Sequence, residues 1–374
     1  MAQAEHREIV WFNAVRGIAA LEVCVSHLRS FLFVNFVAVA RPTVLDRLFY
    51  FATGLGHEAV VIFFVMSGWL VGGSVWRQQR EGRFFWRDYG TARLTRLWLV
   101  LIPALIWTEA VDHLGISMAG GDGYDGSRFV TSSSGPGSDA PLDLSMAAFA
   151  GNALFLQTIL VPVLGTNGPL WSLAYEFWYY AAFPLLAFAW HRRSSWRGVG
   201  FAAAGVAILA WLPAPIEVGF VIWLLGWLGA LTFSRIRASA ALPLTLASVV
   251  LTIALLVVFK QRTIAGSGIF LGVAVAGLLI GLRLQPNSAA LPRAQAAASH
   301  LAKISYTLYL FHFPLLALCF FSLHLTQRQP GAAAYGEFAL LLGAVLIVVT
   351  GLWYLFERRT ESVRQWVRSL WASR

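Results

Sequence analysis

The sequence predicts an all-α membrane protein that crosses the bilayer about ten times, and three observations support this fold class. The chain has 374 residues, of which 58% are hydrophobic and only 12% are charged, whereas soluble domains carry about 25% charged residues. Its apolar residues fall in runs of roughly 20, the length that spans a bilayer as a helix. With 16 Trp and 27 Phe, a soluble globule of this size could not bury the apolar surface.

Ten segments are apolar enough and long enough to be transmembrane helices. In chain order they cover residues 9–34, 57–76, 97–116, 169–190, 198–213, 217–234, 242–260, 264–282, 304–324 and 336–356. The stretch 146–166 is also apolar, but Asn152, Gln157 and Pro162 interrupt it. We therefore expect a re-entrant or interfacial piece there instead of a crossing.

The positive charges predict that both termini are cytoplasmic. Ten crossings place both ends on one side, and most of the 28 Lys and Arg lie in the segments that then face inward. Residues 9–357 form the predicted transmembrane domain. In residues 358–374, Arg alternates with Trp and Val, which predicts a basic amphipathic cytoplasmic tail on the inner leaflet. The net charge of +10 thus indicates topology and lipid contacts, not nucleic-acid binding.

The first predicted helix carries two ionisable residues on one face. Arg16 and His27 are eleven residues apart in RGIAALEVCVSH, which is about 20° past three full turns and about 16 Å along the axis. In the predicted topology Arg16 lies near the cytoplasm and His27 lies deep in the outer half. Such residues are functional candidates by default. The alternatives are an Arg16 that snorkels to the interface and a His27 that bridges helices. Glu22 points away from this line and could pair with Arg29.

Five stretches in this order resemble the acyltransferase-3 family of integral membrane acyltransferases, over about residues 9–357. They are RGIAALEVCVSH, EAVVIFFVMSGWLVG at 58–72, Arg93-Leu94-Thr95-Arg96 followed by Pro103, NGPLWSLAYEFWYYAAFP at 167–184, and ISYTLYLFHFP at 304–314. One position departs from the pattern, because Val61 stands where many relatives have Asp. Glu58 lies three residues earlier on the same helical face and is a candidate for the acidic role, and the alternative is that this chain lacks the role.

The resemblance implies that the chain transfers an acyl group, which we expect to be acetyl, from cytoplasmic acyl-CoA to a carbohydrate hydroxyl. Acyl-CoA is then a donor substrate, and no permanently bound cofactor or metal is expected. Arg16, Arg93 and Arg96 are expected to bind CoA phosphates, because a guanidinium donates two parallel hydrogen bonds. For Arg93 and Arg96, the alternative is simple positive-inside bias. We hypothesise that the thioester reaches His27, which acts as a general base in direct transfer.

The other family blocks supply the remaining candidates. Glu176 is expected to be a second catalytic residue that holds His27 or an arginine in position, with a structural link between helices as the alternative. The candidates for substrate or cofactor binding are Ser67, Trp171, Ser172, Ser305, Tyr309 and His312. Ser305, Tyr309 and His312 share one helical face, while packing is the competing interpretation for Ser67 and His312. Asn167 is a plausible N-cap for the helix that follows.

Two other classes of function remain as alternatives. A transporter or flippase for a lipid-linked sugar would also use buried charges and aromatic residues, but the sequence shows no internal repeat. A non-catalytic scaffold leaves the cost of several intramembrane charges unexplained. The polar stretch 120–143 faces outward in our topology, so we expect the acceptor to be a surface or exported carbohydrate or a lipid-linked glycan. The expected location is the bacterial cytoplasmic (inner) membrane among lipids, and a homo-oligomer is compatible with the sequence.

Overall fold

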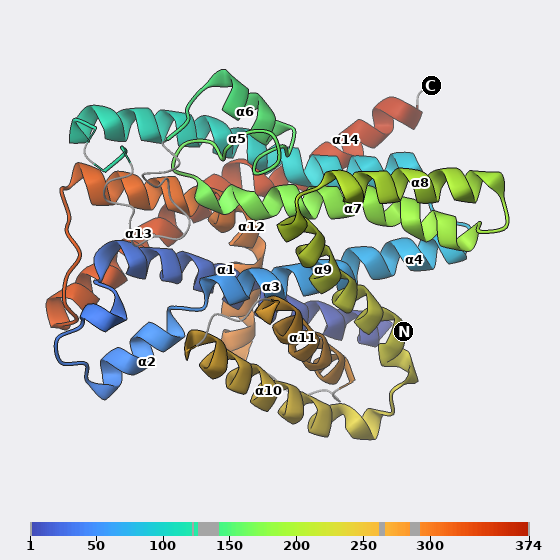
Figure 1. Cartoon of the computed structure of the whole chain (residues 1–374), viewed down its shortest axis with the longest axis horizontal. Coiled ribbons are helices and arrows are strands. Elements are labelled where there is room, and N and C mark those ends of the chain that lie inside the picture. Colours follow the sequence, from blue (N-terminus) through green and yellow to red (C-terminus); the bar gives the residue numbers. More distant parts are fainter. Residues whose placement is uncertain (1, 122, 126–141, 262–265, 285–291, 373–374) are drawn as a thin grey trace. The chain divides into compact units, whose positions relative to one another are not determined.

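The computed structural model describes residues 2–121, 123–125, 142–261, 266–284 and 292–372 (Figure 1). Within these ranges the chain is helical and has no β-strand, which confirms the predicted all-α class. The helices are α1 (Ala2–Leu32), α2 (Val44–Ala52), α3 (Gly56–Ser67), η2 (Gly68–Gly72), α4 (Gly73–Arg80), α5 (Trp86–Ala119), α6 (Met146–Ala153), η3 (Gly168–Leu170), α7 (Trp171–His191), α8 (Trp196–Trp211), α9 (Ala214–Thr232), α10 (Ala241–Gln261), α11 (Ser267–Leu284), α12 (Pro292–Ser322), α13 (Ala332–Leu355), η6 (Glu357–Arg359) and α14 (Thr360–Ala372), with short 3-10 turns η1 (Phe36–Ala38), η4 (Phe233–Arg235) and η5 (Ala238–Ala240).

Seven helical stretches of the described chain are long and apolar enough to cross a membrane. They are Val44–Arg80, Trp86–Ala119, Ala214–Arg235, Ala238–Val258, Ser267–Leu284, Ala296–Ser322 and Ala332–Leu370. The helices predicted at 9–34 and 169–190 also form, as α1 and α7, and the one predicted at 198–213 forms as the shorter α8. The count of ten crossings and the side on which each terminus lies stay predictions.

The predicted interruption at 146–166 is a real break in the helical pattern. Only the eight residues of α6 are helical there before the turns that lead to η3. A helix of eight residues rises about 12 Å, far less than the bilayer core of about 30 Å. The segment is therefore too short to cross as a helix. Most of the polar stretch predicted at 120–143 lies outside the described residues.

The chain divides into two compact units. The first unit comprises Met1–Ala19, His57–Phe85 and Tyr175–Lys303, and the second comprises Ala20–Gly56, Trp86–Ala174 and Ile304–Arg374. Four helices, α1, α3, α7 and α12, contribute residues to both units, α3 only by placing Gly56 in the second.

In the first unit, α9 crosses the π-helical segment η2 with the two backbones in direct contact. A Cβ atom on Gly68 would lie 1.8 Å from the carbonyl oxygen of Trp223, and a Cβ on Gly226 would lie 1.8 Å from that of Val65. Glycine on both sides thus permits the close approach that small residues give to membrane helices. α11 packs against α9 and α10, and Figure 1 shows α10 and α11 side by side.

In the second unit, residues 20–32 of α1 pack against residues 304–322 of α12 through aromatic rings. The ring of Phe31 lies 5.3 Å from that of Phe313, 5.4 Å from that of Phe320 and 6.1 Å from that of Phe321. Glu22, which the sequence left without a clear role, accepts a hydrogen bond of 2.8 Å from the backbone N–H of Leu55, directly before α3. Its carboxylate therefore satisfies a backbone donor at the start of a helix.

Candidate active site

The predicted site residues fall into the two units. Arg16, Ser67 and Glu176 belong to the first. The second contains the larger set, which consists of His27, Arg93, Arg96, Trp171, Ser172, Ser305, Tyr309 and His312.

His27 on α1 and His312 on α12 form a direct pair. The Nδ1 atom of His27 lies 2.8 Å from the Nε2 atom of His312, although the residues are 285 positions apart in the chain. The rings are nearly parallel, with an interplanar angle of 10° and centroids 5.2 Å apart. His312 is only 1% exposed, whereas His27 is partly exposed. The pair thus has one enclosed member and one partly exposed member.

The surroundings of His312 determine how the protons are placed on the pair. Its Nδ1 atom lies 2.7 Å from the carbonyl oxygen of Leu308, which can only accept a hydrogen bond. In the neutral ring, Nδ1 therefore carries the proton and Nε2 carries the lone pair. That lone pair accepts from Nδ1–H of His27, so the lone pair of a neutral His27 is on Nε2. The geometry places a basic nitrogen on the more exposed ring.

One turn before His312, Tyr309 joins α12 to the beginning of α7. Its hydroxyl lies 2.7 Å from Oγ of Ser172 and donates to the carbonyl oxygen of Pro169 at 3.0 Å. Both side chains are buried, and Trp171 beside them is partly exposed. Ser305 lies on the same helix and is 4% exposed. The structure thus brings the two predicted blocks around 172 and 309 into contact.

Asn167 does not cap the helix that follows it, contrary to the prediction, and it bonds across the unit instead. Its Nδ2 atom donates to Oγ1 of Thr108 at 3.0 Å and to the carbonyl oxygen of Leu310 at 2.9 Å. The Leu310 carbonyl lacks its usual helical partner, because Pro314 has no backbone N–H. Asn167 therefore satisfies the acceptor that the proline leaves, two residues before His312.

A buried carboxylate fixes the adjacent loop. Asp112 of α5 is 0% exposed and accepts two hydrogen bonds from Thr166, one from its backbone N–H at 2.7 Å and one from Oγ1 at 2.8 Å. The preceding Gly165 has φ of 54°, and a Cβ there would lie 2.2 Å from Oδ2 of Asp112. The loop that precedes η3 is thus held against α5.

In the first unit, Glu176 is bonded to a group of hydroxyls. Its Oε1 atom accepts from Oγ of Ser67 at 2.9 Å and from the hydroxyl of Tyr180. Ser67 also lies 3.1 Å from that hydroxyl and accepts from Nε1 of Trp223 at 3.1 Å. Glu176 is only partly buried, and its Oε2 atom receives no hydrogen bond from the residues that the structure describes. These contacts link α7 to α3, which is the structural alternative that the sequence analysis gave for Glu176.

Arg16 links α1 to the first part of α12. Its Nη2 atom donates to the carbonyl oxygen of Ala302 at 2.9 Å and to Oδ1 of Asn13 at 3.4 Å. The next residue, Gly17, permits this approach, because a Cβ there would lie 2.9 Å from the backbone nitrogen of Ala302. On α3, Val61 is buried and Glu58 is partly buried.

Arg93 and Arg96 lie in the first part of α5, partly buried and exposed respectively. The guanidinium of Arg93 lies 6.0 Å from the ring centroid of Tyr89, one turn earlier. Among the described residues, no group of three or more His, Cys, Asp or Glu side chains could hold a metal ion.

Sequence reasoning missed three side chains that support these groups. Asp112 carried a signal, because it is a carboxylate inside the predicted span 97–116 and intramembrane acids are functional or structural candidates. Tyr180 carried a weaker one, since it is four residues after Glu176 on the same face. Trp223 carried none, because nothing in a run of apolar residues shows which indole meets Ser67.

Comparison with known proteins gives one family. The sequence model of the family described as an acyltransferase domain, of the acyltransferase-3 type, matches residues 9–357. No curated protein and no solved structure matches the chain significantly.

Proposed function

Because the chain belongs to the acyltransferase-3 family, we propose that this membrane acyltransferase moves an acyl group, expected to be acetyl, from cytoplasmic acyl-CoA to a carbohydrate hydroxyl. The acceptor class is a cell-surface, exported or lipid-linked glycan, and the location is the bacterial inner membrane. The observation that carries the proposal is the His27–His312 pair, with its 2.8 Å contact and the basic nitrogen on His27.

The proposed reaction is direct transfer. Nε2 of His27 takes the proton of the acceptor hydroxyl as its oxygen attacks the thioester carbonyl. The bond from the carbonyl carbon to oxygen forms, and the bond from carbon to sulfur breaks. The thiolate leaves with CoA and receives the proton from the His27 imidazolium. The products are the ester and free CoA, and His27 returns to its starting state.

His312 acts in this scheme as a positioning residue. Its Nε2 lone pair holds Nδ1–H of His27 and so fixes the reactive tautomer. When His27 is protonated, the same hydrogen bond is made to a charged donor, which is stronger than the neutral bond. His312 therefore favours the state that follows proton transfer.

The arginines support the donor side of the proposal. Arg93 and Arg96 supply guanidinium groups near the start of α5, and Arg16 supplies one on α1. α14 packs against α5, which supports a common side for the tail and the two arginines of α5. That side is cytoplasmic in the ten-crossing topology that we propose, with both termini inside.

The test is transfer of label. Purified protein in nanodiscs is incubated with acetyl-CoA labelled in the acetyl group and with the envelope glycan fraction of a strain that lacks the gene. We expect label on the glycan and release of free CoA. His27→Ala should lower this transfer by at least about 100-fold, because general-base catalysis contributes that much or more. The matched control is His113→Ala, since His113 is exposed on α5 and pairs with Glu109 outside both groups.

Three results would contradict the proposal. Near-normal transfer by His27→Ala would remove the base from the mechanism. Movement of a lipid-linked sugar across vesicles without consumption of thioester would establish the transporter alternative, which no structural observation favours. A protein that consumes no acyl-CoA with any envelope fraction would be a scaffold.

A further inference from the structure

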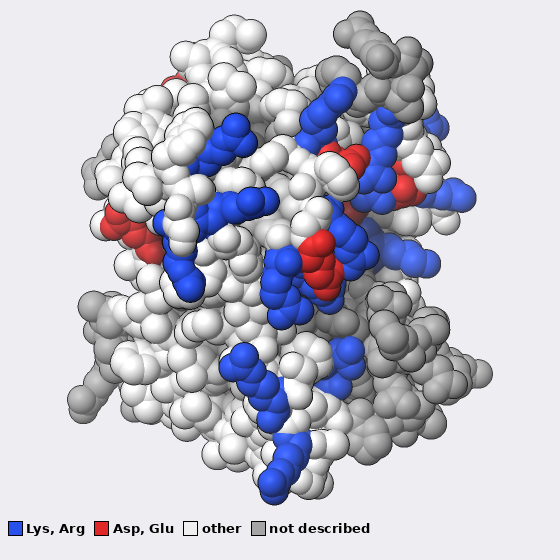
Figure 2. All heavy atoms as spheres, turned by 90° about the vertical axis from the view of Figure 1, so that its right-hand side faces the viewer, with Lys and Arg blue, Asp and Glu red and all other residues white. Residues whose placement is uncertain are grey.

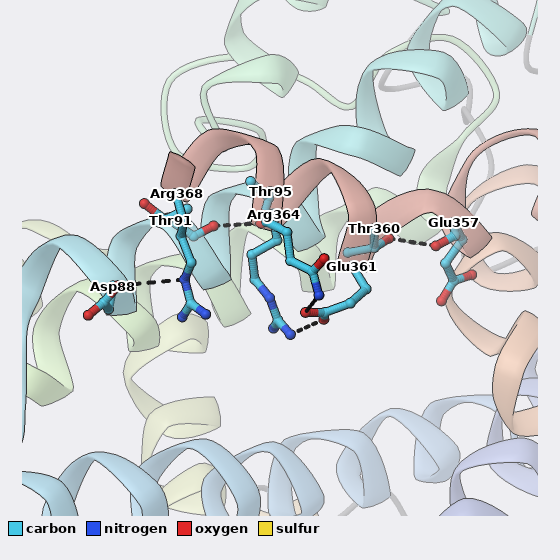
Figure 3. A network of polar contacts seen from close by, with 9 residues as sticks. Asp88, Thr91, Thr95, Glu357, Thr360, Glu361, Arg364 and Arg368 are labelled. Atoms are coloured by element: carbon cyan, nitrogen blue, oxygen red, sulfur yellow. Dashed lines mark hydrogen bonds and ion pairs between the residues drawn. The ribbon is translucent and has the colours of Figure 1, made fainter. Parts of the chain in front are cut away.

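The C-terminal helix α14 packs against the beginning of α5, within the second unit. The two helices are in contact, and Nε of Arg368 lies 3.5 Å from Oδ1 of Asp88 (Figure 3). Asp88 is in the first turn of α5, directly before the segment that carries Arg93 and Arg96. The tail therefore packs beside the segment of α5 that carries the predicted phosphate ligands.

The start of α14 is also held by contacts within the second unit. Glu357 in η6 accepts two hydrogen bonds from Thr307 of α12, one from the backbone N–H at 3.0 Å and one from Oγ1 at 2.6 Å. The neighbouring Tyr306 donates from its hydroxyl to the carbonyl oxygen of Leu97 at 3.2 Å. With η6 near Leu97 and Arg368 near Asp88, α14 runs antiparallel to the first turns of α5 (Figure 3).

This arrangement gathers more positive than negative charge. The start of α5 contributes Arg87, Arg93 and Arg96, and α14 contributes Arg364 and Arg368. Against these stand Asp88, which pairs with Arg368, and Glu361, which pairs with Arg364. Glu357 is already engaged by Thr307. Figure 2 shows a face of the molecule on which Lys and Arg side chains predominate over Asp and Glu.

Arg364 also has a hydrogen-bond donor that no described residue of its unit accepts. One terminal nitrogen pairs with Glu361, but its Nε–H is buried and donates to no residue in the described part of the chain. Its side chain as a whole is 30% exposed. A planar guanidinium with remaining donors is suited to the oxygens of a phosphate group.

We propose that Arg364 and Arg368 of α14 form one phosphate-binding surface with Arg93 and Arg96 of α5, and that this surface holds the phosphate groups of the acyl-CoA donor. The inference rests on the proposed function for the identity of the donor. The chemistry that it names, a phosphate group bound by guanidinium pairs, could also come from a lipid headgroup, and the experiment separates these two sources.

The experiment measures binding of CoA to the full chain by calorimetry in nanodiscs of phosphatidylcholine, which supply no anionic lipid. The double variant Arg364→Gln/Arg368→Gln should bind CoA at least about tenfold more weakly than the wild type, since hydrogen bonds to charged groups contribute about 1.5–3 kcal/mol. It should bind pantetheine, which lacks the phosphates, as the wild type does. Arg364→Lys/Arg368→Lys keeps the charge and should recover part of the loss. The matched control Arg192→Gln/Arg193→Gln removes two exposed arginines beyond α7 and should leave CoA binding unchanged.

The second arm repeats the measurements with phosphatidylglycerol and counts the lipids that native mass spectrometry finds retained on each protein. Equal CoA affinity for wild type and double variant, with fewer retained anionic lipids on the variant, would overturn the acyl-CoA assignment and assign the phosphate to lipid. Equal CoA affinity with equal lipid retention would overturn the surface altogether. If the wild type and the double variant bind CoA with the same affinity, this inference alone is refuted. If the wild type binds no CoA, the proposed function is refuted. In that case the lipid arm still tests whether the arginines bind phosphate groups.

Discussion

His312 holds its Nε2 atom 2.8 Å from Nδ1 of His27 while its own Nδ1 faces the carbonyl oxygen of Leu308 at 2.7 Å. A backbone carbonyl cannot donate, so this single contact orders the protons on both rings. In the mechanism that we propose, the enclosed ring of His312 takes the place of the carboxylate that more often orients a catalytic histidine.

The first prediction concerns His312 as a positioning residue. His312→Ala should lower kcat by about 10- to 100-fold, because a hydrogen bond to a charged imidazolium contributes about 1.5–3 kcal/mol. KM for acyl-CoA should change little, since His312 is enclosed. His312→Gln offers an amide oxygen to Nδ1–H of His27 and should recover part of the rate. If His312→Ala raised KM and left kcat intact, the residue would bind substrate and would not orient the base.

The second prediction concerns the free oxygen of Glu176. Glu176→Gln keeps an oxygen for Ser67 and Tyr180 but replaces Oε2 with an amide nitrogen, so the fold should keep its melting temperature. We expect acyl transfer to fall by about tenfold or more, because the amide nitrogen cannot accept the charged hydrogen bond that Oε2 could accept from a substrate or an arginine during the reaction. The partner variant Ser67→Ala removes a donor to Oε1 and the acceptor of the Trp223 indole N–H but leaves Oε2 in place, and it should affect the rate less. Full activity of Glu176→Gln would reduce the residue to a link between α7 and α3.

The third prediction concerns the crossing of η2 and α9. Gly68→Ala would place a Cβ 1.8 Å from the carbonyl oxygen of Trp223, and forcing the helices apart should lower the free energy of unfolding by about 1–3 kcal/mol. Gly200→Ala in α8 is the matched control, because nothing lies within 4 Å of its Cβ position. That variant should be as stable as the wild type or slightly more stable, since alanine has a higher helix propensity than glycine. Thermal unfolding of both variants in the same detergent measures the difference.

The fourth prediction concerns the loop held by Asp112. Asp112→Ala leaves the backbone N–H and the hydroxyl of Thr166 buried without their acceptor, which should cost about 1–3 kcal/mol for each donor. Asp112→Asn keeps one acceptor and should be intermediate. Protease cutting after residues of the 162–170 loop reports its release. Cutting as slow in Asp112→Ala as in the wild type would mean that other contacts hold this loop.

Local properties of the chain were predictable from the sequence. Apolarity over 20 residues is a local property, so the positions of the long helices followed from composition, and the interruption at 146–166 followed from its polar and proline residues. Helical periodicity also placed Ser305, Tyr309 and His312 on one face of α12. The N-cap expected at Asn167 was wrong, because tertiary packing offered its amide the Leu310 carbonyl that Pro314 leaves without a helical partner.

What the sequence by itself determined is the class of protein, the family blocks and the residues whose charge is costly in a membrane. Only the tertiary structure decided their partners: His312 for His27, Ser67 for Glu176, Leu55 for Glu22, and α5 for the basic tail. The physical reason is that a helix forms from bonds within four residues. The choice of partner depends instead on how helices distant in the chain pack, and periodicity fixes only the face that each one presents.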